Sequence, residues 1–251
     1  MRNVLSTLLT TMLLLSACAS NVAAIHGTPT ANQVLTNVRM VANGLKSYRV
    51  TRTITETTLY TGVPASEPAV EFHQVIEVSA TDEYRISDSE IGMDYIRSGM
   101  RTYSNNTAGQ WELHPFERNL DDGFFPGQAT ERPPMHPLEW LDKRVLANTA
   151  YMGLDEIDGH TVYVVTGQIS MLPAPASDDR LIPADNVRIY ADTISFNVVR
   201  IEIDRNILDV EREDVGYQVI PGVVDIDTIE VLDYSEHNNT IEITLPNVPT
   251  H

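Results

Sequence analysis

Apolar and polar side chains alternate along many short segments of this chain, and this two-residue repeat constrains its fold most strongly. Segment 48–55 is rich in β-branched residues and alternates throughout, and segment 70–78 places Phe72 and Ile76 on one face and Glu77 on the other. Successive side chains of a β-strand point to opposite faces of the sheet. Each segment therefore predicts a strand with one buried face.

The alternation continues over most of the chain, where short polar turns separate the segments. Asp158-Gly159 is a strong signal for one such hairpin turn. Consecutive strands joined by short turns pair antiparallel, and one face of such a sheet can cover a core. Two proline-containing stretches, 116–137 and 172–185, are predicted as long loops. The further strands are predicted near residues 83–88, 91–97, 100–104, 110–114, 150–157, 160–169, 186–191, 196–205, 208–219, 226–235 and 240–245.

Two other segments favour helices. Thr30 and Gln33 fit a capping box, after which apolar residues recur with helical spacing as far as Gly44, a suitable left-handed terminator. The second predicted helix runs from Pro137 to about Ala147, with acidic residues early and basic residues late. The apolar stripe of the first helix consists of Val34, Leu35, Val38, Val41, Ala42 and Leu45, and Thr36, Arg39, Asn43 and Lys46 lie opposite. We expect the stripe to be buried and Arg39 to contribute little to stability.

These elements predict an α+β, mainly β fold. The expected architecture is one curved antiparallel sheet of about 10–11 strands with helices on one face. The chain has 251 residues, of which 42% are hydrophobic, so it is long enough to bury a full core. No convincing repeat of 20 to 50 residues occurs, which argues against a solenoid or propeller. We predict a single domain over residues 31–251.

Charge and reactive residues narrow the functional classes. The 17 Lys and Arg residues face 35 Asp and Glu residues, a formal charge of −18 that repels phosphate backbones, so no nucleic acid partner is expected. A single cysteine excludes a disulfide framework and a thiolate zinc cluster. The histidines are scattered, and the acidic pairs lack EF-hand spacing, so neither a metal nor a cofactor is predicted. G-x-S-x-G and phosphate-binding glycine loops are absent, and we predict no enzyme.

The first 30 residues predict export and anchoring. Residues 1–17 have the pattern of a signal peptide, whose apolar run over 4–15 is shorter than the ~20 residues that span a bilayer. Leu15-Ser16-Ala17-Cys18 resembles the bacterial lipobox, in which the cysteine receives diacylglycerol on sulfur and becomes the N-terminus. Residues 18–30 are then a lipidated N-terminus and linker, held to a membrane by acyl chains such as palmitate. We expect a bacterial envelope lipoprotein that faces the periplasm or the exterior.

A series of short motifs follows in order along the chain. They are Leu45-Lys46-Ser47-Tyr48, Arg101-Thr102-Tyr103, Gly109-Gln110-Trp111-Glu112, 157–164, 189–192, 198–203, Tyr234-Ser235 and 241–246. Behind a lipobox, this order resembles the LolA-like superfamily of outer-membrane lipoprotein carriers, and most of all the anchored LppX/LprG-like glycolipid-binding lipoproteins. The resemblance implies a half-open β-barrel that helices close over an apolar cavity. It implies no catalytic residue.

The favoured function is therefore noncatalytic binding or transport of a lipid or another apolar molecule. The candidate cavity residues are Leu35, Val38, Val50, Ile54, Phe72 and Ile76, together with Phe124 and Phe125, two adjacent aromatics that could close the cavity mouth or touch a membrane. Two alternatives remain open. One is an envelope protein-binding or sensing module with the same fold and a filled core. The other is a hydrolase with paired carboxylates, which nothing in the sequence singles out.

Overall fold

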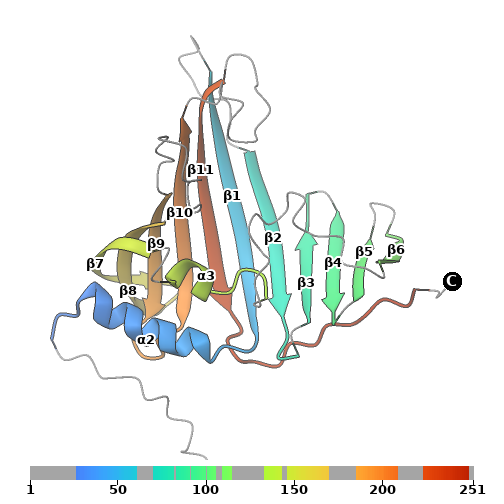
Figure 1. Ribbon diagram of the computed structural model, residues 1–251, viewed down its shortest axis with the longest axis horizontal. Coiled ribbons are helices and arrows are strands. Elements are labelled where there is room, and N and C mark those ends of the chain that lie inside the picture. Colours follow the sequence, from blue (N-terminus) through green and yellow to red (C-terminus); the bar gives the residue numbers. More distant parts are fainter. Residues whose placement is uncertain are drawn as a thin grey trace, which may run out of the picture.

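The computed structural model describes residues 27–60, 70–81, 83–90, 92–99, 101–105, 109–114, 133–142, 146–169, 185–208 and 223–248. Within them, eleven strands form one antiparallel sheet in the order β6-β5-β4-β3-β2-β1-β11-β10-β9-β8-β7, and two helices lie on one face (Figure 1). The sheet is curved and its edge strands do not pair. The predicted mainly β, half-open barrel of about 10–11 strands is confirmed. Cys18, Phe124, Phe125 and most of the two predicted long loops lie outside the described residues.

The strands follow the predicted alternation closely. Asp158 and Gly159 adopt positive φ angles of 50° and 79°, and the hairpin that they close joins β7 to β8 as predicted. The helices are α2 Ala31–Asn43 and α3 Leu138–Leu141. The strands are β1 Tyr48–Tyr60, β2 Val70–Val78, β3 Tyr84–Asp88, β4 Met93–Ser98, β5 Arg101–Asn105, β6 Trp111–His114, β7 Leu146–Ile157, β8 His160–Ile169, β9 Asp185–Asp192, β10 Val198–Leu208 and β11 Val223–Ser235.

Helix α2 begins at the predicted capping box. The Gln33 N–H donates to Thr30 Oγ1 at 3.3 Å, and the Thr30 N–H donates to Gln33 Oε1 at 2.9 Å. The end of the helix differs from the prediction, because Gly44 has φ −92° rather than a left-handed angle. Its N–H donates to the Val41 carbonyl at 3.0 Å, so the last turn tightens with i→i−3 bonds and needs no left-handed residue.

The predicted second helix is wrong in length. It ends at Leu141, and Asp142 is already extended with φ −61° and ψ 128°. Leu146 then opens β7 and pairs with Ile169 of β8. The segment predicted as one helix is thus divided between a single helical turn, Leu138–Leu141, and strand β7, whose backbone is satisfied by pairing with β8.

The predicted strand over 240–245 is also wrong. Strand β11 ends at Ser235, and residues 239–248 run on without pairing in the sheet. Both neighbours of β11 are already occupied, since β1 pairs on one side and β10 on the other. Residues that follow β11 leave the centre of the sheet, so no unpaired strand edge lies beside them with which they could pair. Of the predicted strand over 208–219, Leu208 belongs to β10 and the other residues lie outside the described part.

The core lies between α2, α3 and the sheet. Of the predicted stripe of α2, Val34, Leu35, Val38 and Ala42 are buried, and Val41 and Leu45 are partly buried. Ala31 and Asn37, which the stripe did not include, are buried as well. The stripe side chains pack in one cluster with side chains from β1, β2, β8, β9, β10 and β11. We call the helix-covered face of the sheet its inner face and the opposite face its outer face.

Candidate functional site

Burial on the inner face falls steadily with distance from the helices. Along β2 the inner side chains are Val78, Ile76, Gln74, Phe72 and Val70, and their exposed fractions are 0, 0, 7, 39 and 51%. The helices therefore cover one end of the sheet and leave apolar side chains at the other end accessible. We call these the covered end and the open end.

The candidate cavity residues divide between these two ends. Val50 and Ile76 are register partners, and both are fully buried in the same core cluster as Leu35 and Val38 of α2. Ile54 pairs with Phe72 nearer the open end, where Ile54 is half-buried and Phe72 is exposed. The sequence thus indicated the correct face of β1 and β2, and the structure separates its packed part from its accessible part.

A row of polar side chains lies between the two ends. Arg52 Nε donates to Glu230 Oε1 at 2.6 Å, and Arg52 Nη1 donates to Gln74 Oε1 at 3.0 Å. Gln74 Nε2 then donates to Asp88 Oδ2 at 3.1 Å. We call these four residues the polar belt. It crosses β3, β2, β1 and β11, and its Arg52 and Glu230 side chains are largely buried, so each charge has a partner where water is scarce.

The polar belt was not predicted from the sequence. The available signal was the position of Arg52 in the two-residue repeat, because the alternation along β1 assigns that position to the buried face. Glu230 and Gln74 carry the same signal on β11 and β2. A second ion pair joins two neighbouring strands: Arg205 Nη2 of β10 and Asp185 Oδ2 of β9 are 2.8 Å apart.

Residues 133–142 form a strap across the covered end. The Tyr48 hydroxyl donates to the Pro134 carbonyl at 2.9 Å, and the Tyr234 hydroxyl donates to the Met135 carbonyl at 3.0 Å. Burial, reinforced by Tyr48, raises the pKa of Tyr234 well above its usual value, so this phenol stays a hydrogen-bond donor. The two tyrosines come from adjacent strands and hold the strap over the core.

Arg39 fastens the other end of the strap, contrary to the expectation that it contributes little. Its Nε donates to the Leu141 carbonyl at 2.6 Å, and its side chain is half-buried. Burial lowers the pKa of the Arg39 guanidinium from its usual value, and the nearby Asp142 carboxylate opposes that shift. The helical wheel of α2 assigned Arg39 to the solvent side because it contains no information about α3.

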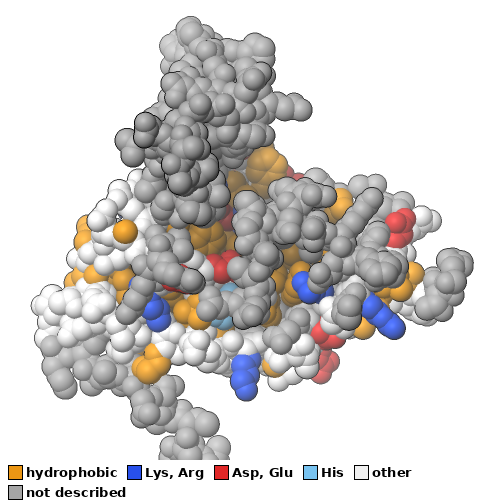
Figure 2. Space-filling model, viewed as in Figure 1, with side chains coloured by type: hydrophobic (Ala, Val, Ile, Leu, Met, Phe, Trp, Pro, Cys, Tyr) orange, Lys and Arg blue, Asp and Glu red, His pale blue; other side chains and the backbone are white. Residues whose placement is uncertain are grey.

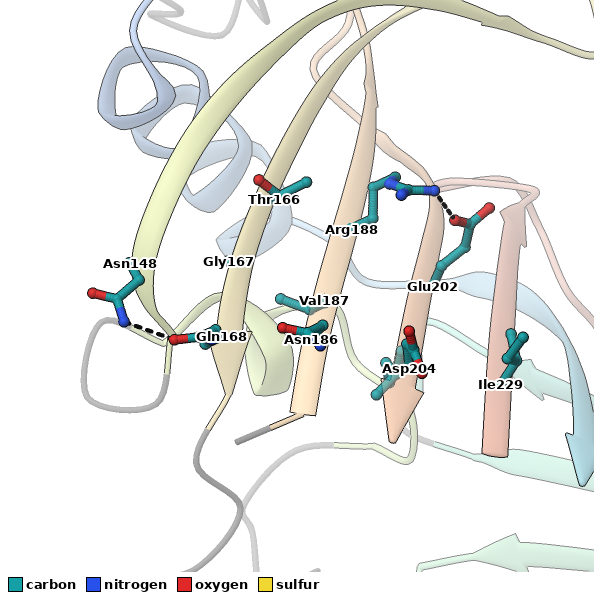
Figure 3. A pocket seen from close by; sticks show the side chains of 11 residues that line it. Asn148, Thr166, Gly167, Gln168, Asn186, Val187, Arg188, Glu202, Asp204 and Ile229 are labelled. Carbon is teal, nitrogen blue, oxygen red and sulfur yellow. Dashed lines mark hydrogen bonds and ion pairs between the residues drawn. The ribbon is translucent and has the colours of Figure 1, made fainter. Parts of the chain in front are cut away.

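The outer face carries a shallow hollow of about 590 Å³. Figure 3 shows polar side chains from β7, β8, β9 and β10 around it. Two pairs of these side chains are bonded to each other: Asn148 Nδ2 donates to Gln168 Oε1 at 2.7 Å, and Arg188 Nη1 donates to Glu202 Oε2 at 3.0 Å. The hollow is a polar surface of the sheet and is distinct from the apolar open end.

A serine, a histidine and an aspartate also meet on the surface. Asp192 Oδ1 accepts from Ser195 Oγ at 2.8 Å, and Asp192 Oδ2 lies 3.4 Å from His160 Nδ1. A nucleophilic triad needs the histidine beside the serine, whereas here the aspartate separates them. Burial opposes ionisation of Asp192, but hydrogen bonds from Ser195 and Ile194 outweigh it and lower the pKa of the carboxyl. This arrangement stabilises the turn between β9 and β10.

No helix in the described part of the chain combines the length and apolar character needed to cross a membrane. No group of three or more His, Cys, Asp or Glu side chains is arranged there to hold a metal ion.

Known proteins that resemble this chain were found among solved structures. No protein-family model and no curated protein matches the chain. Lipoprotein LppX of Mycobacterium tuberculosis is 17% identical with a TM-score of 0.48, covering 85% of this chain and 99% of that one. LprF of Mycobacterium bovis is 15% identical with a TM-score of 0.44 over 88% and 99%. A LolA superfamily protein of Nitrosomonas europaea is 12% identical with a TM-score of 0.28 over 88% and 96%.

Proposed function

We propose that this protein is a lipid-anchored envelope lipoprotein that binds a lipid or another apolar molecule at the open end of its inner face. The observation that carries the proposal is the gradient of burial along β2, which leaves Phe72 and Val70 accessible beside the half-buried Ile54. An alkyl chain placed against these side chains removes apolar surface from water, and each buried CH₂ contributes about 0.8 kcal/mol.

The polar belt sets the depth that the apolar part of such a ligand reaches. An alkyl chain gains nothing by displacing the partners of Arg52 and Glu230, because an unpaired buried charge is costly. The apolar part therefore stays on the open side of the belt. With two carboxylates and one guanidinium, the belt carries a net negative charge. It favours a neutral or cationic polar group over an anionic one wherever the ligand approaches it.

The anchor in this proposal is Cys18, which follows the short apolar run of residues 4–15. Two or three acyl chains on this residue hold the protein to a membrane although its formal charge is −18. Comparing wild type with Cys18→Ser by detergent phase partitioning tests the anchor. Equal membrane association of both proteins would refute it.

A matched pair of substitutions tests the binding site. Phe72 on the inner face is 39% exposed, and Val75 on the outer face of the same strand is 37% exposed. The protein carrying Cys18→Ser is purified without detergent and titrated with a fluorescent fatty acid, and its bound ligand is measured by native mass spectrometry. Fully burying a large apolar side chain is worth about 1.5–3 kcal/mol, and about two-fifths of Phe72 is still exposed, so Phe72→Ser should weaken binding roughly three- to sevenfold. Val75→Ser should leave binding unchanged.

The same experiment separates this function from its alternative. Saturable binding that is weakened in Phe72→Ser but unchanged in Val75→Ser supports a lipid-binding protein. A correctly folded wild-type protein with no bound lipid and no saturable binding would refute the proposal and favour a protein-binding module.

A further inference from the structure

The acidic residues of this chain are unevenly distributed. The first acidic residue is Glu56, so all 35 Asp and Glu residues lie in the last four-fifths of the sequence. The preceding 55 residues contain Arg2, Arg39, Lys46 and two arginines of β1. A chain with formal charge −18 therefore has an N-terminal part, including all of α2, that carries no negative side chain.

Helix α2 presents this acid-free sequence on the surface of the domain. Its stripe faces the core, and its outward side chains are uncharged and polar except for the exposed Met40. In Figure 1 the helix lies at the lower border of the molecule. In Figure 2 the side chains over α2 are white, orange and blue, whereas the red acidic side chains lie elsewhere on this face. The exposed residues of this surface are Asn32, Gln33, Thr36, Met40, Asn43 and Lys46.

Basic groups lie beside several of the acids near this surface. Glu77 pairs with Arg49 at 2.6 Å. The positive charge of Arg39 acts on Asp142. The partner of Glu236 is uncharged: its carboxylate accepts a hydrogen bond from the Asn239 amide, in the turn that is bonded to residues 46 and 47. Glu77 and Asp142 thus each have a basic neighbour close to the α2 surface.

We propose that the outer surface of α2 lies against an anionic lipid bilayer and orients the anchored domain on it. This inference rests on the proposed lipidation of Cys18, which lies 12 linker residues before Ala31, a reach of at most about 40 Å. An anchored domain of this charge is repelled by anionic headgroups on its acidic faces. The α2 surface escapes that repulsion, and Lys46 and Met40 add an attractive charge and an apolar contact. The open end of the inner face then points away from the bilayer.

Fluorescence quenching in the membrane tests this orientation. Because Cys18 is the only cysteine, Met40→Cys or Asn186→Cys adds a single free thiol for a fluorophore to the lipidated protein. Asn186 is exposed on the outer face, at the open end of β9.

The proteins are reconstituted into anionic vesicles that contain a headgroup quencher. We expect quenching at position 40 to exceed quenching at position 186 at least threefold. Thr36→Glu should reduce the difference, and the matched Asn186→Glu, tested with the label at position 40, should not.

The outcomes distinguish the two proposals. Equal quenching at both positions, in protein that stays with the vesicles through an acylated Cys18, would overturn the orientation and leave the anchor intact. Failure of Thr36→Glu to change the quenching would overturn the electrostatic basis of the orientation. A wild-type protein that does not stay with the membrane would refute the anchor, and the orientation with it.

Discussion

Substitution of Arg39 by alanine should destabilise this protein through the strap, although Arg39 lies away from the apolar stripe of α2. The last carbonyls of a helix have no partner within it, and in α3, a single turn, the Leu141 carbonyl accepts from Arg39 Nε at 2.6 Å. A hydrogen bond from a charged group contributes about 1.5–3 kcal/mol. Because the site is half-buried, water can replace part of this hydrogen bond in the variant. We therefore expect Arg39→Ala to lower the free energy of unfolding by about 1–2 kcal/mol.

Thermal and urea unfolding measure this effect directly. For a domain of this size, 1 kcal/mol corresponds to about 2–4 °C, so the melting temperature should fall by about 2–8 °C. Thr36→Ala is the control, because Thr36 is exposed on the same helix and its hydroxyl bonds only to the Asn32 carbonyl in the preceding turn. Arg39→Lys keeps the charge but loses the guanidinium geometry, and it should recover part of the stability.

Equal unfolding midpoints for Arg39→Ala and Thr36→Ala would refute this reasoning. They would mean that the bond to Leu141 does not hold the strap and that α2 binds α3 through apolar contacts alone.

Three further predictions concern the core, a close backbone approach and pH. Leu35→Ala should lower the free energy of unfolding by about 2–5 kcal/mol in urea denaturation, because Leu35 is fully buried. Gly167→Ala should cost about 1–3 kcal/mol in the same assay, since a Cβ there would lie 2.6 Å from Leu146 Cδ1 and 3.1 Å from a backbone oxygen of β7. Burial lowers the pKa of His237 below its usual 6.5, although its bond to the Val198 carbonyl opposes the shift. The unfolded chain therefore takes up the proton first, and stability should fall as the pH drops below 6.5; this loss should vanish in His237→Gln, and an unchanged pH profile would contradict it.

Local sequence was sufficient for the elements whose partners lie nearby. The capping box of Thr30 and Gln33, the stripe of α2 and the turn at Asp158 depend on interactions within a few residues, and all three appear as predicted. The alternation along β1 and β2 also identified the inner face correctly, because a two-residue period has only two possible assignments and the buried one is apolar. The order of strands, motifs and helices was enough to indicate the fold class.

Tertiary structure decided everything that depends on a distant partner. Residues 240–245 alternate like a strand, but β1 and β10 already occupy both sides of β11. Arg39 receives its role from α3, and the polar belt exists only because four strands bring Arg52, Gln74, Asp88 and Glu230 side by side. The division of the inner face into covered and open ends has the same origin. A periodic pattern indicates which side of an element is buried, whereas the helix that reaches over it determines how far along the element burial extends.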